Sequence, residues 1–249
     1  MSNRRITAIL LAAGVGRRLD QPGALPKVLA EIGGASLLAR HLALLAQAGV
    51  DAVSFTIGHQ GEAIRRAVRG AGSPLDIRFV ENERYREGSL GSLWRQDDLL
   101  RRGETVLLMD GDVLYDRRML ERLIAAPGEA VMLVDRNIEP GDEPVKICFR
   151  GDAIVDFRKR PEHAHDWHGE SVGFFKFSPA MAIALADRCE AYYRSGAPLP
   201  EYEEAIRDLI LTDPARFKAC DVSDLPWTEI DFPEDLAKAR DAILPKLAP

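Results

Sequence analysis

Two kinds of phosphate-binding group stand close together near the start of the chain. Small residues let the backbone turn sharply and expose its N–H groups; they are Ala12, Ala13, Gly14 and Gly16, after Leu11. Arg17 and Arg18 lie in the same stretch, and Lys27 follows Pro26. Exposed N–H groups and fixed cations together suit a chain of phosphates. The stretch therefore predicts a polyphosphate site.

This loop differs from the two best-known phosphate loops. The dinucleotide-binding fingerprint needs a third glycine at the start of a helix, and Leu19 stands there instead. The P-loop needs a Gly-Lys-Ser/Thr sequence, which the chain lacks. A glycine-rich turn that served only packing would not need Arg18 and Lys27, so we favour the phosphate-binding interpretation.

Carboxylates that could hold a metal ion occur in two places. Asp110 and Asp112 flank a glycine directly after an apolar stretch, and Asp231 lies just before a helix that would start at Pro233. Carboxylate oxygens are ligands that Mg²⁺ prefers. An Asp-Gly-Asp sequence can also be a plain turn, and Asp231 can merely cap the helix. We favour a magnesium site that combines Asp112 with Asp231.

Two further segments allow both a structural and a functional interpretation. Gly88 and Ser89 offer small side chains and free N–H groups, which suit either a helix start or close contact with a base and ribose. Glu201, Tyr202 and Glu204 lie in the first turns of an expected helix, where the helix dipole alone favours acids. Carboxylates beside an aromatic ring also form a site for an organic cation.

The elements that must position these residues are predicted from the apolar pattern. Strands are expected at residues 6–11, 51–57, 76–80, 104–109 and 130–134, and helices at 36–47, 61–69, 90–100 and 117–125. This alternation indicates an α/β fold with a Rossmann-like, doubly wound, mostly parallel sheet and helices on both faces. Such sheets bind ligands outside the carboxyl ends of their strands, where the phosphate loop and Asp112 would lie.

The second part of the chain departs from this alternation. Residues 143–149 and 152–157 predict a β-hairpin, and residues 171–177 predict a further buried strand in what is then a mixed sheet. Residues 163–168 hold three of the five histidines, and we expect a polar surface loop there, with a zinc site as the less favoured alternative. A helix is expected over 179–194. We expect one domain over 1–249 with a small inserted hairpin lobe.

The composition excludes several classes of protein. A formal net charge of −6 and a pI of about 5.5 disfavour nucleic-acid binding. No apolar run approaches the length of a membrane span, so we expect no membrane partner. The three cysteines form neither a metal motif nor a disulfide framework, which favours a cytoplasmic location.

The ordered set of motifs resembles a known family. The set comprises the loop at 11–19, Pro26-Lys27, Glu81-Asn82 with Gly88-Ser89, Asp110-Gly111-Asp112 and Trp227-Thr228-Glu229-Ile230-Asp231. Together these motifs resemble the bacterial CTP:phosphocholine cytidylyltransferases and their relatives, the 2-aminoethylphosphonate cytidylyltransferases. The resemblance spans nearly the whole chain, and the C-terminal motif is the part that indicates the cytidylyl branch.

The resemblance implies a reaction and the residues that carry it. CMP would pass from CTP to a small phosphorylated or phosphonate acceptor, and pyrophosphate would leave. Lys27 would neutralise the α-phosphate as charge builds up, and Arg18 would hold the triphosphate. Asp112 and Asp231 would hold Mg²⁺.

The other implied roles fall into two groups. The residues implied to bind the nucleotide are Leu11, Ala12, Ala13, Gly14, Gly16, Arg17, Asn82, Gly88, Ser89 and Asp110. Those implied to bind the acceptor are Lys146, Glu201, Tyr202, Glu204 and Glu229. Residues 1–135 would form the nucleotide-binding half and residues 136–249 the acceptor-binding half, and a homodimer is compatible with this organisation.

Two alternatives stay open at this point. The first is a nucleotidyltransferase that acts on a sugar-1-phosphate or inositol-1-phosphate with UTP, GTP or CTP. Acidic residues at Glu201 and Glu204 disfavour a neutral sugar. The second is a non-catalytic nucleotide-binding domain, which would not need Lys27, Asp112 and Asp231 together.

Overall fold

A mixed sheet of nine strands forms the centre of the computed structural model, which describes residues 5–14, 25–138 and 141–248. Four of the strands are parallel neighbours in the order β5-β4-β1-β6. They are β1 (Ile6–Ala12), β4 (Ala52–Ile57), β5 (Asp76–Glu81) and β6 (Thr105–Asp110). Because β4 and β5 lie on one side of β1 and β6 lies on the other, the strand order reverses between β1 and β6.

The remaining strands make the sheet mixed. The long strand β11 (Trp167–Phe177) runs antiparallel to β6, to β8 (Ala130–Asp135) and to β9 (Lys146–Arg150). The hairpin partner of β9 is β10 (Ala153–Arg158), and β12 (Phe217–Asp221) pairs in parallel with β8. The predicted hairpin therefore extends the same sheet.

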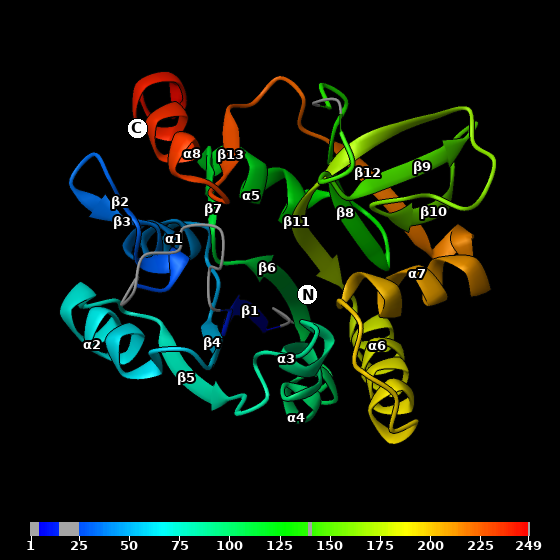
Figure 1. Ribbon diagram of the computed structural model, residues 1–249, viewed down its shortest axis with the longest axis horizontal. Coiled ribbons are helices and arrows are strands. Elements are labelled where there is room, and N and C mark those ends of the chain that lie inside the picture. The colour runs from blue at the N-terminus through cyan, green and yellow to red at the C-terminus, as the bar shows by residue number, and fades with distance from the viewer. Residues whose placement is uncertain (1–4, 15–24, 139–140, 249) are drawn as a thin grey trace.

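Helices cover both faces of the sheet, as Figure 1 shows. One face carries α1 (Leu37–Gln47), α2 (Gly61–Ala71) and α5 (Arg117–Ala125), and the other carries α3 (Leu90–Trp94), α4 (Asp97–Leu100), α6 (Pro179–Arg194) and α7 (Glu203–Thr212). In β6, Leu107 and Met109 belong to the first hydrophobic core, and Val106 and Leu108 to the second. A strand buried on both faces is apolar without alternation, which is the pattern that its sequence has. The predicted fold class is confirmed.

Short elements surround the sheet, some near β1 and others in the C-terminal segment. Near β1 lie η2 (Lys27–Leu29), β2 (Glu31–Ile32) and β3 (Ala35–Ser36). Toward the C-terminus lie η3 (Pro214–Arg216), β13 (Trp227–Glu229), α8 (Pro233–Lys238), η4 (Ala239–Ile243) and η5 (Leu244–Lys246). Strand β13 pairs antiparallel with β7 (Val113–Tyr115), which directly follows the Asp-Gly-Asp turn.

Some local predictions differ from the structure. The helix expected over 90–100 is interrupted and forms two short helices, α3 and α4. The buried Gln96 lies between them and forms hydrogen bonds with β4. Its amide donates to Thr56 Oγ1 at 2.8 Å and accepts from Ser54 Oγ at 2.8 Å. In the histidine-rich segment, His163 precedes β11, whereas His168 already lies in that strand. Among the described helices, none is long and apolar enough to cross a membrane.

Candidate active site

The site lies at the carboxyl ends of β1 and β6, where the strand order reverses. Asp110 stands in register with Leu11, and the Gly111 N–H donates to the Leu11 carbonyl at 3.3 Å. Two parallel strands that pair end at the same edge of the sheet, so the start of the phosphate loop and the Asp-Gly-Asp turn become neighbours. This is the edge at which doubly wound sheets bind ligands.

A cleft of about 580 Å³ opens at this edge and collects most of the predicted residues. The predicted residues that line it are Leu11, Ala12, Ala13, Gly14, Lys27, Gly88, Ser89, Asp110, Asp112, Glu201, Tyr202, Glu229 and Asp231. Gly16, Arg17 and Arg18 lie outside the described residues, so their roles stay predictions.

Three carboxylates gather on one wall of the cleft. Oxygens of Asp112, Glu229 and Asp231 lie within 4.8 Å of one another. The pairing of β7 with β13 brings them together, and the Ile230 N–H also donates to the Asp112 carbonyl at 2.9 Å. Glu229, which the resemblance implied for the acceptor, thus joins the two residues expected to hold the metal.

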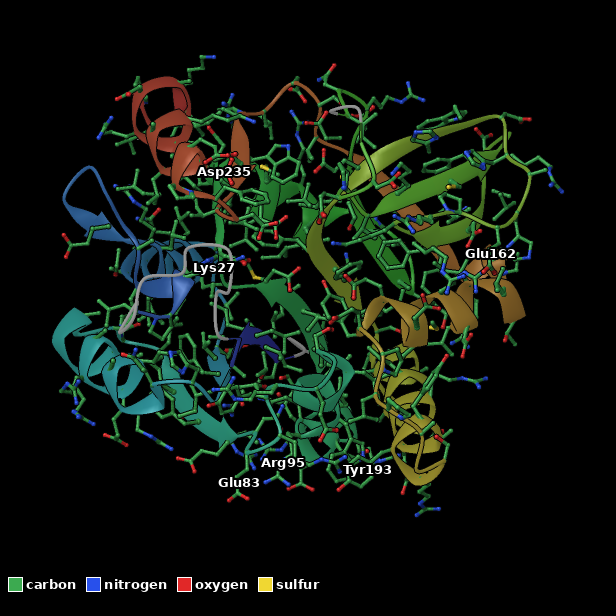
Figure 2. All side chains as sticks on the ribbon, in the orientation of Figure 1. Lys27, Glu83, Arg95, Glu162, Tyr193 and Asp235 are labelled. Carbon is green, nitrogen blue, oxygen red and sulfur yellow. The ribbon has the colours of Figure 1, made fainter. Side chains whose placement is uncertain are left out.

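Lys27 lies against this cluster. Its Nζ is 3.0 Å from Asp112 Oδ2 and also contacts Asp231 Oδ1. Figure 2 shows Lys27 near the middle of the molecule, with the C-terminal segment that carries Asp235 above it. Burial opposes the charge of Lys27, but the two neighbouring carboxylates outweigh burial and raise its pKa. Lys27 therefore stays protonated.

One lysine does not balance three carboxylates. Burial, followed by the negative charges of Asp112 and Asp231, raises the pKa of Glu229 to about 8. A group of oxygen ligands with excess negative charge fits a hard divalent cation such as Mg²⁺. The donor set therefore suits the metal that the sequence predicts.

Asp110 occupies a different environment from Asp112. The hydroxyl of the buried Tyr202 donates to Asp110 Oδ2 at 2.7 Å. Burial and then the charge of Asp112 raise the pKa of Asp110 well above its usual range. Space for this carboxylate comes from Gly173 in β11, where a Cβ would collide with it and where φ is +77°.

The loop at 83–89 packs against the segment that leads into α7. The Ser89 N–H donates to Glu201 Oε2 at 2.9 Å, and Ser89 Oγ accepts from the Tyr202 N–H at 2.9 Å. These bonds join the segment expected to face the base to the segment expected to face the acceptor. Asn82 is buried behind this wall, where its Nδ2 donates to Ser92 Oγ at 3.0 Å, and it does not line the cleft.

Two of the residues predicted to bind the acceptor also do not reach the cleft. Glu204 accepts from Arg158 Nε at 3.0 Å and so faces β10. Lys146 donates to the carbonyls of Gly141 at 3.0 Å and Lys159 at 3.0 Å. Glu162, another partner of Arg158, lies at the right of Figure 2, whereas Lys27 lies left of the centre.

The acid that lines the cleft in place of Glu204 is Glu203, which the sequence analysis did not single out. Burial raises the pKa of Glu203 to about 7. Helix α7 begins at Glu203, and its buried residues include Ala205, Ile206 and Ile210. Position 203 borders this buried stripe and position 204 points away from it, so the helical period would have distinguished them.

His41 is a second residue whose role was missed. It is buried in α1, and its Nε2 lies 3.2 Å from the Gly111 carbonyl. Burial lowers the pKa of His41 to about 4, so the ring is neutral at pH 7. A carbonyl only accepts, so Nε2 carries the proton and donates to the turn that separates Asp110 from Asp112. The sequence signal was a histidine on an apolar helical stripe.

Comparison with known proteins identifies the family. Residues 8–170 match the MobA-like NTP transferase domain. The chain belongs to this nucleotidyltransferase family. It is 29% identical over 241 residues to the CMP-5'-(3-aminopropyl)phosphonate synthase of Streptomyces rubellomurinus. This alignment covers 94% of this chain and 38% of that protein. It is 29% identical over 243 residues to a bifunctional IPC transferase and DIPP synthase of Rubrobacter xylanophilus, covering 96% of this chain and 52% of the relative. The chain thus spans about half or less of the length of these relatives.

Solved structures share the fold. The CTP:phosphocholine cytidylyltransferase LicC of Streptococcus pneumoniae gives a TM-score of 0.77 at 19% identity, over 95% of this chain and 98% of that one. The inositol-1-phosphate CTP transferase of T. maritima gives a TM-score of 0.72 at 20% identity, over 98% and 99%. The family match and these relatives confirm the resemblance found in the sequence.

Proposed function

We propose that the protein transfers CMP from CTP to a small acceptor that carries a phosphate or phosphonate group and a cationic nitrogen, with release of pyrophosphate. The observation that carries the proposal is one cleft with two unlike walls. Lys27 and the cluster of Asp112, Glu229 and Asp231 line one wall. Glu201, just before α7, and Glu203, its first residue, line the other. The first wall suits a triphosphate with a metal ion, and the second suits a cation.

The transfer needs no covalent intermediate with the protein. An oxygen of the acceptor phosphate or phosphonate, already ionised at neutral pH, attacks the α-phosphorus of CTP. The bond from that phosphorus to the bridging oxygen of the β-phosphate breaks, and pyrophosphate leaves with the electron pair. Lys27 neutralises negative charge as it builds up on the α-phosphate, and the cleft holds the two reactants in line.

A divalent cation, expected to be Mg²⁺, would be held by Asp112 and Asp231 together with Glu229. When bound, such an ion neutralises phosphate charge and aligns the triphosphate for displacement. Lys27 remains beside Asp112 and Asp231, with which it forms ion pairs. His41 supports the arrangement by holding the carbonyl of Gly111 between the two aspartates.

A second candidate acceptor is inositol-1-phosphate or a sugar-1-phosphate. The observation in its favour is the relative named as a bifunctional IPC transferase, which matches 96% of this chain. Against it stand Glu201 and Glu203, because a neutral polyol lacks the charge–charge attraction to two acids that a cation would gain. We therefore place the aminoalkyl acceptor first.

Pyrophosphate release tests the proposal directly. Purified protein is mixed with each of the four ribonucleoside triphosphates, Mg²⁺ and one acceptor at a time: 2-aminoethylphosphonate, phosphocholine, inositol-1-phosphate or glucose-1-phosphate. We expect turnover with CTP and a cationic acceptor, and none after EDTA. Turnover only with inositol or sugar phosphate would preserve the nucleotidyltransferase reaction and overturn the cationic acceptor. An absence of turnover with every pair would overturn both.

A further inference from the structure

Among the acids that line the cleft in the described part of the chain, only Glu203 has a side-chain oxygen that is buried and lacks a hydrogen-bond partner. Its Oε2 is shielded from solvent, and no residue in the described part of the chain donates a hydrogen bond to it. Its neighbour Glu201 is exposed and accepts from the Ser89 N–H. Asp110 accepts from the Tyr202 hydroxyl. Glu203 thus lines the part of the cleft assigned to the acceptor's nitrogen, and one of its oxygens is a buried hydrogen-bond acceptor without a partner in the described part of the chain.

A buried carboxylate oxygen without a donor loses its hydration and gains nothing in return. The protein cations nearby do not fill this role. Lys159 lines the cleft, but its Nζ pairs with Glu143 Oε2 at 3.3 Å. Lys27 pairs with Asp112 and Asp231 on the other wall. A ligand that enters the cleft with an N–H or O–H group can supply the missing hydrogen bond.

The aromatic side chains of the cleft argue for an N–H group as well. Quaternary ammonium ions have no hydrogen to donate and are recognised by several open aromatic faces. In the described lining the rings are those of Tyr85 and Tyr202. The Arg86 guanidinium already lies 5.5 Å from the centre of the Tyr85 ring. The Tyr202 ring stands edge-on to Phe175, with ring centres 6.0 Å apart. These rings do not form a cage for three methyl groups.

We propose that Glu203 accepts an N–H from the protonated primary amine of the acceptor and so selects aminoalkyl phosphates or phosphonates over their trimethylammonium analogues. The inference rests on the proposed cytidylyl transfer and narrows its acceptor class. A site built to hydrogen-bond a substrate N–H discriminates strongly against an analogue without one, because the protein group is then left buried and unpaired. In this arrangement Glu203 contacts the amine end of the acceptor and not the attacking oxygen, so its loss is expected to raise KM more than it lowers kcat.

The test compares two acceptors that differ only at nitrogen, 2-aminoethylphosphonate and its N,N,N-trimethyl analogue, with saturating CTP and Mg²⁺. For the unmodified protein we expect kcat/KM to favour the primary amine by about 100-fold or more. Glu203→Ala is expected to lower kcat/KM for the amine, mainly through KM, and to leave the trimethyl analogue nearly unchanged. Glu203→Gln keeps the shape of the side chain and is expected to act in the same direction.

Matched controls separate a local from a general effect. Asp208→Asn changes another acid of α7 that does not line the cleft, and is expected to keep the preference. Binding of CTP alone reports whether each variant is folded. Equal turnover of both acceptors by the unmodified protein would overturn the inference and leave the proposed function standing. A preference that survives in both Glu203 variants would also overturn it. Turnover restricted to inositol or sugar phosphate would instead overturn the acceptor half of the proposed function.

Discussion

At the scale of single residues, the acidic cluster and Lys27 depend on one another. Asp231 lies beside both Lys27 and the other two carboxylates, so it is expected to serve both the metal and the lysine. Asp231→Asn removes one negative charge and keeps the shape of the side chain. We expect kcat/KM for pyrophosphate release to fall by about 100-fold or more, as for loss of a group that stabilises transition-state charge. We also expect the Mg²⁺ concentration for half-maximal rate to rise.

The control for this variant is Asp241→Asn, because Asp241 is exposed in the C-terminal segment and forms an ion pair with the exposed Arg240. This variant should keep the rate and the Mg²⁺ dependence. Phe232, not Asp231, is the N-cap of α8, so the alternative that Asp231 merely caps this helix is wrong. If Asp231→Asn retained both as well, Asp231 would serve neither the metal nor Lys27.

The sequence predicted most residues of the cleft, and the exceptions have physical reasons. Glu204 was implied by the family resemblance, which names an acid near the start of the helix but does not give the face on which that acid lies; in the structure Glu203, the first residue of α7, lines the cleft instead. Neighbouring helical positions point about 100° apart, so an acid is assigned to a face only when its phase is known. His41 was visible only as part of an apolar stripe, since its partner is a carbonyl 70 residues away.

At the scale of elements, the joint between the loop at 83–89 and the segment before α7 depends on a missing side chain. A Cβ on Gly88 would overlap the carbonyl oxygens of Leu199 and Pro200. Both neighbours are backbone, so neither can rotate away. We expect Gly88→Ala to push the two segments apart, to disturb the hydrogen bonds of Ser89, and to lower kcat/KM for both CTP and the acceptor. Steady-state kinetics with each substrate varied in turn measures this.

Gly70→Ala provides the matched comparison. Gly70 lies in α2, and nothing stands within 4 Å of the position that its Cβ would take. Alanine is favoured over glycine in a helix by about 1 kcal/mol, so we expect unchanged kinetics and a slightly higher melting temperature. Normal kinetics in Gly88→Ala would show that the two segments can separate without cost to the site.

The strands and helices that could be predicted from the sequence are those with a recognisable local pattern, such as an apolar run, an apolar stripe or a capping residue. Strands β1, β4, β6 and β8 are long apolar runs, and α1 has both an apolar stripe and a Ser36 cap that accepts from the Ala39 N–H. Strands β7 and β13 have three residues each and exist because they pair across more than a hundred residues of chain. No local period identifies such strands, yet this pair gathers the three carboxylates.

At the scale of the whole molecule, the site exists only when both parts of the chain are folded together. Its carboxylates come from position 112 and from positions 229 and 231. The last described residues return to the same region, because the Ala248 N–H donates to Asp116 Oδ2 at 2.8 Å. Asp116 directly follows β7 and caps α5, so one buried side chain links the C-terminal segment to the strand beside the acidic cluster.

The ionisation of Asp116 makes the free energy of unfolding depend on pH. Burial would raise the pKa of Asp116, but its hydrogen bonds from Arg118 and Ala248 outweigh burial and lower the pKa to about 2. The unfolded value is about 4. Because the folded pKa is the lower one, the stabilisation is complete above pH 4 and is lost as the pH falls toward 2. The difference corresponds to about 2.5 kcal/mol at pH 7, of which about half is lost by pH 3.

Urea unfolding of Asp116→Asn at pH 7 and pH 3 measures the link. Asparagine cannot gain from ionisation, so the free energy of unfolding that this variant loses relative to the unmodified protein should be about 1 kcal/mol smaller at pH 3 than at pH 7. Asp152→Asn, at an exposed hairpin turn, controls for the general effect of removing an acid and should show little difference between the two pH values. An equal loss for Asp116→Asn at both pH values would mean that Asp116 contributes by shape alone. The ionised carboxylate would then not hold the C-terminal segment against the strand beside the site.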